Sequence, residues 1–455
     1  MTSTSGTTHA HLPRRIMLAL AGPSIPLAAL SLPMVVYLPA YYSGSLGLDL
    51  ATVGSVFMIV RLLDIGFDPL IGGVMDRMKT RFGRYRPWLV VATPLIMLSM
   101  AMLFMARPGA SAMHLAGWLL VIYAGWSIMS LAQLALAANV SPDYHERSRI
   151  YGWWQIAFSI GMIGAMLMPK IIGMFGVRDQ AASMAAMAWL VICLTPLMVA
   201  ITLALVRERP IATERQGGGL REYFELMRNR TVQRLLACEA LLGITGGATS
   251  TLALFYFTRT KGLDAADLGL LFILHAIAGM VFTPFWSGLA IRIGKHSALG
   301  LTALLYASGQ VAIWLVPAGQ LAMLLAAQCL IGIAYGGASL LPRAMIADVS
   351  DEERLRARQE RTGLLYALLI GVWKIGQAVS VGLMFWGLAL FGFDPAPGAA
   401  NGAAALLGLQ LLYIALPVVL CVGAALVAFR YPLTAARHAD IRRELERLDA
   451  ANAAA

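Results

Sequence analysis

The sequence predicts an all-α polytopic membrane protein with twelve transmembrane helices in two six-helix repeats. Three observations predict it: the composition, the number and length of the apolar runs, and the likeness of the two halves of the chain. The chain has 455 residues, of which 59% are hydrophobic and 13% charged. Soluble domains carry about 25% charged and about 45–50% apolar residues, so the excess apolar surface predicts burial in lipid.

The apolar runs have the length that a bilayer requires. A hydrocarbon core is crossed by about 20 residues of α-helix, and a crossing segment must be helical because lipid offers no partner for backbone polar groups. We expect spans at 17–43, 51–75, 87–106, 113–140, 149–175, 181–206, 232–259, 265–291, 297–317, 320–346, 362–391 and 405–429.

The basic residues predict the orientation of these spans. The net charge is +11, but the basic residues fall in short segments between spans, such as 79–86, 207–234 and 354–361. This distribution indicates membrane topology rather than a nucleic-acid surface. Because most of the Lys and Arg lie on one side, the positive-inside rule predicts a multi-pass protein of the cytoplasmic (inner) membrane with both termini cytoplasmic.

The two halves of the chain resemble each other. N-V-S-P-D-Y-H-E-R at 139–147 follows the fourth span, and D-V-S-D-E-E-R at 348–354 follows the tenth. Two six-helix repeats of the same orientation are typical of the major facilitator fold. We expect an N-terminal bundle at 1–206, a cytoplasmic linker at 207–231, a C-terminal bundle at 232–429 and a cytoplasmic tail at 430–455.

Charged residues inside the spans are the strongest candidates for function, since each costs about 2.5–3.5 kcal/mol at the bilayer centre. Arg61, Asp64 and Asp68 share one face of the second span, and Lys374 lies at comparable depth in span 362–391. Two neighbouring carboxylates need a counter-charge, which Arg61, Lys374, sodium or a shared proton could supply. A structural ion pair is the alternative, but the surplus acid favours a cation site whose occupancy changes the preferred conformation.

A longer motif surrounds these charges. Residues 61–88 read R-L-L-D-I-G-F-D-P-L-I-G-G-V-M-D-R-M-K-T-R-F-G-R-Y-R-P-W. This stretch resembles the second-helix signature of the glycoside–pentoside–hexuronide:cation symporter family of the major facilitator superfamily. The segment A-D-V-S-D-E-E-R, with Lys374 further along the chain, is also similar to that family.

The resemblance implies a secondary active transporter and not an enzyme. It implies sodium- or proton-coupled symport of a sugar, glycoside, uronate or related polar solute by alternating access. The cation site would comprise Asp64, Asp68 and Ser127, with Lys374 near both cation and solute. We therefore expect no catalytic residues, no cofactor, no metal beyond a transported sodium, and a monomer whose partners are the solute and membrane lipid.

The resemblance also implies a gate on the cytoplasmic side. Its contacts between the halves would come from charged residues after the second span: Asp76, Arg81, Arg84 and Arg86. Asp348 and Asn139 occupy equivalent positions in the two repeats, at cytoplasmic helix ends, and we predict gate or capping roles for them.

The solute site departs from the family pattern. Three charged positions that the family's galactoside carriers use for sugar hydroxyls correspond here to Ala28, Ser130 and Gln155. Cation coupling is thus expected to persist around a rebuilt pocket. We expect amide, hydroxyl and aromatic side chains to line it: Ser130, Gln155, Trp126, Trp154 and Trp373.

Two other readings remain open from the sequence. The loss of three pocket charges, together with 24 methionines, also fits a carrier of lysolipids or other amphiphiles. A membrane enzyme or a non-transporting sensor is disfavoured, because the spans hold no nucleophile–base pair or metal cluster. The absence of a G-x-x-x-x-G-K-[ST] motif argues against ATP-driven transport.

Overall fold

The computed structural model describes residues 13–78, 80–140, 144–176, 179–208, 225–357 and 362–454. Within these ranges every labelled element is a helix, and twelve helices are long and apolar enough to cross a membrane. Both the all-α class and the number of spans are therefore confirmed.

The first half contains six spans. They are α1 (Arg14–Ala21) continued by α2 (Ser24–Leu32), η1 (Pro33–Tyr37), α3 (Leu38–Ala40) and η2 (Tyr41–Ser45); α4 (Leu50–Arg77); α5 (Arg86–Phe104); α6 (Ala112–Val140); α7 (Tyr144–Met174); and α8 (Gln180–Leu205).

The second half repeats this order. Its spans are α10 (Arg230–Arg259); α11 (Ala265–Ile293); α12 (Lys295–Leu315); α13 (Leu321–Ala357); α14 (Thr362–Leu390); and α15 (Ala403–Gln410) continued by η3 (Leu411–Ala415) and α16 (Leu416–Phe429); α17 (Ala435–Ala454) follows. Much of the predicted linker, 209–224, lies outside the described residues.

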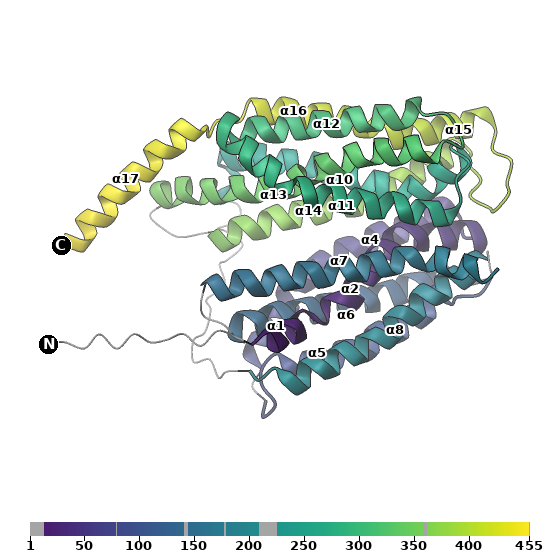
Figure 1. Ribbon diagram of the computed structural model, residues 1–455, viewed down its shortest axis with the longest axis horizontal. Helices are drawn as coiled ribbons and strands as arrows, with labels where there is room; N and C mark the ends of the chain where they lie inside the picture. Colours follow the sequence, from purple (N-terminus) through teal and green to yellow (C-terminus); the bar gives the residue numbers. More distant parts are fainter. Residues whose placement is uncertain are drawn as a thin grey trace.

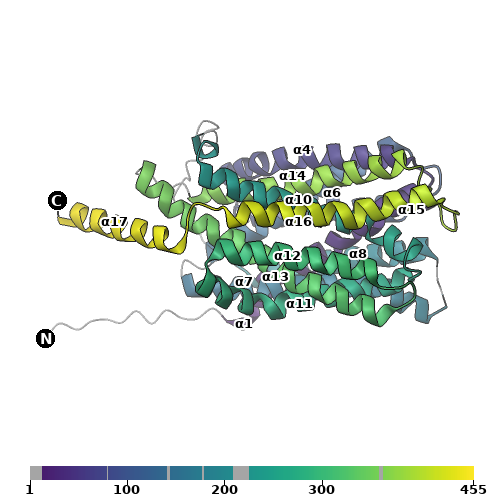
Figure 2. The ribbon, with the colours of Figure 1, turned by 90° about the horizontal axis from the view of Figure 1, so that it is seen from above.

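The halves form two bundles that lie side by side, with α1 and α17 toward the same end of the molecule (Figure 1). Across the boundary, α4 packs along α14 and α7 packs along α11. Figure 2 shows α4 and α14 running together along one edge. This is the arrangement expected of the major facilitator fold.

The first span is irregular. Pro33 begins the π-helical segment η1, and a second π segment, η2, ends the span. Proline has no backbone N–H and breaks the hydrogen-bond ladder of a helix, and π turns often occur at functional sites. The η1 segment contacts α10, so this irregular stretch lies at the boundary between the halves.

Helix α13 is longer than the predicted span 320–346, since it continues to Ala357. The apolar run ends near residue 346, but the helix continues beyond it. Arg354 and Arg356 lie in its last turn, where positive charge stabilises a helix end. The tail helix α17 packs against α13. It is not solvated all round, because Ile441 and Leu445 are buried.

The α4–α14 pair is tightly packed only at one end. A Cβ at Gly54 would lie 2.7 Å from Phe385 Cβ, and one at Gly382 would lie 2.7 Å from Met58 Sδ. By contrast, a Cβ at Gly66 or Gly371 would meet no described atom within 4 Å. Among the described residues, the close contacts between α4 and α14 therefore lie toward the end away from α17.

Candidate functional site

Asp64 is a buried charged residue inside the second span. It lies in α4 and only 2% of it is exposed. The Ser127 hydroxyl of α6 donates to Asp64 Oδ1 at 3.2 Å, and Arg61 Nη1 lies 3.6 Å from Oδ2. The structure thus brings Asp64 and Ser127 together, and their role as a cation site stays a prediction.

Arg61 supplies a positive charge beside Asp64. Its guanidinium carbon also lies 4.6 Å from the centroid of the Tyr123 ring, a separation suited to a cation–π contact.

The Asp68 side chain lies outside the described residues, although its backbone belongs to α4. Its distance from Asp64 and its place in a cation site therefore stay a prediction.

Lys374 lies on α14, the helix that faces α4 across the boundary. Gly54 lies opposite Phe385, and Met58 lies opposite Gly382. This antiparallel register, extended along the two helices, brings Lys374 level with the turn of α4 that begins at Asp64. The predicted similarity in depth is therefore consistent with the helix pairing.

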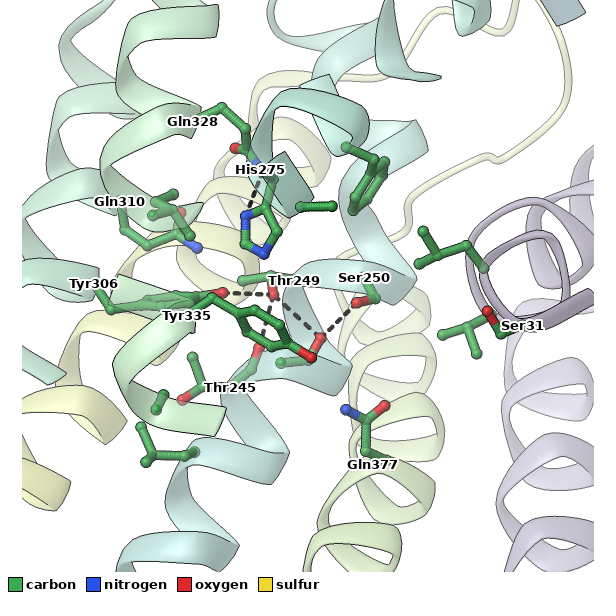
Figure 3. A pocket seen from close by; sticks show the side chains of 18 of the residues that line it. Ser31, Thr245, Thr249, Ser250, His275, Tyr306, Gln310, Gln328, Tyr335 and Gln377 are labelled. Atoms are coloured by element: carbon green, nitrogen blue, oxygen red, sulfur yellow. Dashed lines mark hydrogen bonds between the residues drawn. The ribbon is translucent and has the colours of Figure 1, made fainter. Parts of the chain in front are cut away.

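A cavity of about 270 Å³ lies beside this part of α14, mostly within the second half (Figure 3). Five helices of that half and η3 line it, together with a few residues of the first and fifth spans. The polar and aromatic residues of its wall are Ser31, Thr245, Thr249, Ser250, Phe272, His275, Tyr306, Gln310, Gln328, Tyr335, Trp373, Gln377 and Tyr413.

Small residues give the cavity its shape. A Cβ at Gly332 or Gly336 of α13 would lie 2.4 Å from the carbonyl oxygen of His275 or Gly279 of α11, respectively. Glycine at i and i+4 lets two membrane helices approach closely. This close crossing holds His275 next to α13, where Gln328 Nε2 lies 3.4 Å from His275 Nδ1.

The cavity wall is rich in hydrogen-bond acceptors. The hydroxyls of Thr245, Thr249 and Ser250 donate to carbonyl oxygens of their own helix, at 2.8, 2.9 and 2.7 Å. Their oxygens keep lone pairs. The side-chain oxygens of Gln310 and Gln328 are buried and have no hydrogen-bond partner among the described residues.

The predicted solute residues separate into two groups. Trp373 lines the cavity. The other four lie elsewhere: Ser130 donates to the Ser127 carbonyl at 3.2 Å, Trp126 packs on the core, the Trp154 ring stacks on Phe158, and Gln155 is exposed. The α10 hydroxyls and the two buried glutamines of the cavity were not predicted from the sequence, although polar residues inside spans were a usable signal.

The arginines after α4 make their described contacts within the first half. The Glu208 carboxylate, directly after α8, accepts from the backbone N–H of Arg84 at 2.8 Å and of Tyr85 at 3.0 Å. The Arg86 guanidinium donates to the Leu203 carbonyl. Glu208 thereby caps the start of α5, a role that was not predicted from the sequence.

The other predicted gate residues either make their contacts within one half or have side chains outside the described residues. The Arg81 guanidinium carbon lies 4.8 Å from the centroid of the neighbouring Phe82 ring, while the side chains of Asp76 and Asn139 lie outside the described residues. Asp348 binds Lys295 Nζ at 2.6 Å, within the second half. Because the contacts described for these residues lie within one half, the predicted gate contacts between the halves stay a prediction.

Known proteins show the same architecture and related sequence. The family described as MFS/sugar transport protein matches residues 20–435. The putative glycoside/cation symporter YagG of Escherichia coli (strain K12) is 23% identical over 414 residues, covering 89% of each chain. The glucuronide carrier protein homolog of the same organism is 24% identical and covers 90% of each chain.

Solved structures agree on the fold. A bacterial homolog of the human lysosomal transporter Spinster, inward-facing and unoccupied, matches with a TM-score of 0.70 and 15% identity over 92% of this chain and 97% of its own. The nucleoside transporter NupG matches with a TM-score of 0.68 and 16% identity, over 91% and 99%. These structures and the family match, which covers most of the chain, agree with the resemblance found in residues 61–88. The protein is therefore a membrane transporter of the MFS/sugar transport family, in the glycoside–pentoside–hexuronide:cation symporter group of the major facilitator superfamily.

Proposed function

We propose that this protein couples the entry of sodium or a proton to the uptake of a sugar or glycoside. The observation that carries the proposal is the buried Asp64 carboxylate, with the Ser127 hydroxyl at 3.2 Å and Arg61 at 3.6 Å. Carboxylate and hydroxyl oxygens suit a hard cation, and Asp68, one helical turn further along α4, would supply a second carboxylate. The relatives named as glycoside/cation symporter and glucuronide carrier support this class of solute.

Alternating access would follow from the α4–α14 boundary. Trp386 Nε1 of α14 donates to Ser55 Oγ of α4 at 2.9 Å, whereas toward the end that carries α17 a Cβ at Gly66 or Gly371 would meet no described atom within 4 Å, so the bundles would open at that end. The positive-inside rule favours a cytoplasmic location for that end, and a carrier of the inner membrane that opens there would be inward-open. A cation between Asp64 and Asp68 would offset the negative charge of α4 and so change the electrostatic attraction between α4 and Lys374 of α14. A single chain contains both halves of this device, so the functional unit is the monomer.

Uptake into proteoliposomes tests the proposal. Imposed sodium and proton gradients should drive accumulation of at least one member of a panel of sugars, glycosides and uronates. Asp64→Asn and Asp68→Asn should abolish the gradient-driven accumulation while counterflow of unlabelled against labelled solute continues. Asp264→Asn, at an exposed helix start whose side chain makes no capping bond, is the matched control and should accumulate normally. Normal accumulation by Asp68→Asn would refute the coupling role of the pair.

A further inference from the structure

A second hollow lies at the surface of the C-terminal bundle, between the start of α10 and the end of α16. The two helices run beside each other (Figure 2), and the groove between them has a volume of about 400 Å³. We propose that this groove binds an anionic phospholipid, with the phosphate on its arginines and an acyl chain on its apolar floor. The lining residues are Gln233, Arg234, Ala237, Leu426, Val427 and Arg430.

Two arginines from different helices meet at the polar end of the groove. Arg234 lies in the second turn of α10, and Arg430 directly follows the last residue of α16. The Arg234 guanidinium donates to the Arg430 carbonyl oxygen, which holds the two residues together. Because a guanidinium carries five N–H donors, most of the donors of this pair remain available to a ligand.

The charges of these two arginines are not offset within the described part of the chain. Neither Arg234 nor Arg430 forms an ion pair with a described acidic side chain. By contrast, Arg437 of α17 lies 3.4 Å from Glu352 at the same end of the molecule. Two cationic side chains without a counter-charge favour an anion beside them, and the planar guanidinium matches phosphate oxygens in two-pronged hydrogen bonds.

The depth of the groove selects the source of the phosphate. The spans that contain the lining residues are Arg230–Arg259 and Ala403–Phe429, so both arginines lie where the hydrocarbon core ends. Lipid phosphates occupy this level of a bilayer, and the positive-inside rule favours the cytoplasmic leaflet, where anionic lipids attract Lys and Arg. A phosphate attached to a lipid is therefore already positioned at the groove.

The floor of the groove is apolar and suits a hydrocarbon chain. Ala237 and Val427 form part of this floor, and Val419, Val422 and Leu426 are exposed on α16. These last three are spaced i, i+3 and i+7, so they form one stripe that leads from the groove into the hydrocarbon region. A soluble phosphate would leave this stripe uncovered, whereas a phospholipid would cover it.

Other contacts of the groove are satisfied within the protein. Gln233 Nε2 donates to the Met227 carbonyl oxygen at 2.8 Å. On the buried side, Cys238 Sγ donates to the Ala424 carbonyl oxygen at 3.6 Å, so α10 and α16 are in contact behind the floor. The groove is thus closed toward the core and open toward the surrounding membrane, and its unpaired polar groups are the two guanidiniums.

Native mass spectrometry of the full-length protein in detergent tests the proposal. The probes are phosphatidylglycerol and phosphatidylcholine with the same acyl chains, each titrated separately. A basic residue near an anionic lipid surface contributes about 1 kcal/mol, or about fivefold in affinity. We therefore expect one phosphatidylglycerol to bind at least about fivefold more tightly than phosphatidylcholine, and Arg234→Gln and Arg430→Gln each to weaken its binding about fivefold.

Matched variants separate this site from general surface charge. Arg292→Gln removes an exposed arginine from the last turn of α11, and Arg437→Gln removes one that is paired with Glu352. Neither should change phosphatidylglycerol affinity. The Arg430 side chain makes no described hydrogen bond or ion pair, so an effect of Arg430→Gln on lipid affinity does not reflect a lost contact within the protein.

A second pair of variants tests the apolar floor. Ala237→Phe places a larger side chain in the groove and should weaken the binding of phosphatidylglycerol while both arginines remain. Leu301→Phe enlarges an exposed side chain of α12 and should leave this binding unchanged. Equal melting temperatures in detergent without added lipid would show that the two variants are equally folded.

Three results would overturn the proposal. Equal affinity of the wild-type protein for the two lipids would remove the role of the headgroup charge. Unchanged phosphatidylglycerol binding in both Arg234→Gln and Arg430→Gln would remove the site itself. Displacement of the lipid by an equal concentration of glycerol 1-phosphate would show a site for soluble phosphates. None of these measurements uses uptake, so their outcome is independent of the proposed symport.

Discussion

The two halves share a helix order but place different chemistry at the middle of the membrane. The first half holds the buried Asp64 with Arg61 and Ser127. The second half holds an uncharged cavity of hydroxyl, amide and aromatic groups. The difference is that charged groups belong to one bundle and the neutral cavity to the other, so on the proposed symport coupling would act through the boundary where α4 meets α14. Variants of one half should then leave the chemistry of the other intact.

The largest effect is expected from Arg61→Leu. Removing one member of a buried ion pair costs up to about 3–5 kcal/mol, and Asp64 would lose the cation 3.6 Å away. We expect a lower melting temperature in detergent and no coupled uptake. Arg61→Leu combined with Asp64→Asn should recover the melting temperature but not the coupling. Wild-type behaviour of Arg61→Leu would show that the charges of the first half are dispensable.

A substitution in the second half should give the opposite pattern. Gly336→Leu would push α13 away from α11, since a Cβ there already lies 2.4 Å from the Gly279 carbonyl oxygen. Overpacking of this kind costs about 1–3 kcal/mol. We expect a raised KM for solute, while cation-induced thermal stabilisation persists. Loss of the cation response together with solute affinity would mean that the halves do not act separately.

A smaller effect is expected from Glu208→Ala. The Glu208 carboxylate accepts backbone hydrogen bonds at the start of α5, and loss of such a cap costs about 0.5–2 kcal/mol. The melting temperature should fall while both the solute KM and the cation dependence stay unchanged. An altered cation dependence would instead assign Glu208 a part in coupling.

The smallest effect is expected from His438→Ala. His438 Nε2 lies 2.9 Å from Asp351 and joins α17 to α13. Partly exposed pairs of this kind contribute about 0–1 kcal/mol. Uptake rates should match wild type, and limited proteolysis should cleave α17 sooner. A large change in uptake would reveal that the tail acts on the transport cycle.

Hydropathy was sufficient to predict the number and type of the spans, because a bilayer imposes both the length and the helical conformation. It failed for the end of α13, where helix propensity and packing against α17 continue the helix beyond the apolar run. The irregular first span was also missed, although Pro33 and Pro39 were visible in the sequence.

The candidate site was predictable in its charged part and not in its neutral part. Arg61, Asp64 and Lys374 stand out because charge is costly in a membrane. The glutamines at 310 and 328 carry no such penalty, and only the three-dimensional structure brings them beside Thr249 and Trp373. Ser130 and Gln155 were chosen from the positions of family charges, and their part in solute binding stays a prediction.

The irregular first span has a mechanical consequence. A straight helix with an unbroken hydrogen-bond ladder resists bending, whereas kinks occur at proline and at π turns. Ser31 and Leu32 of the cavity wall directly precede η1, and η1 touches α10. The first span can therefore bend more easily there than a straight helix of the same length, at the point where it contacts the second half.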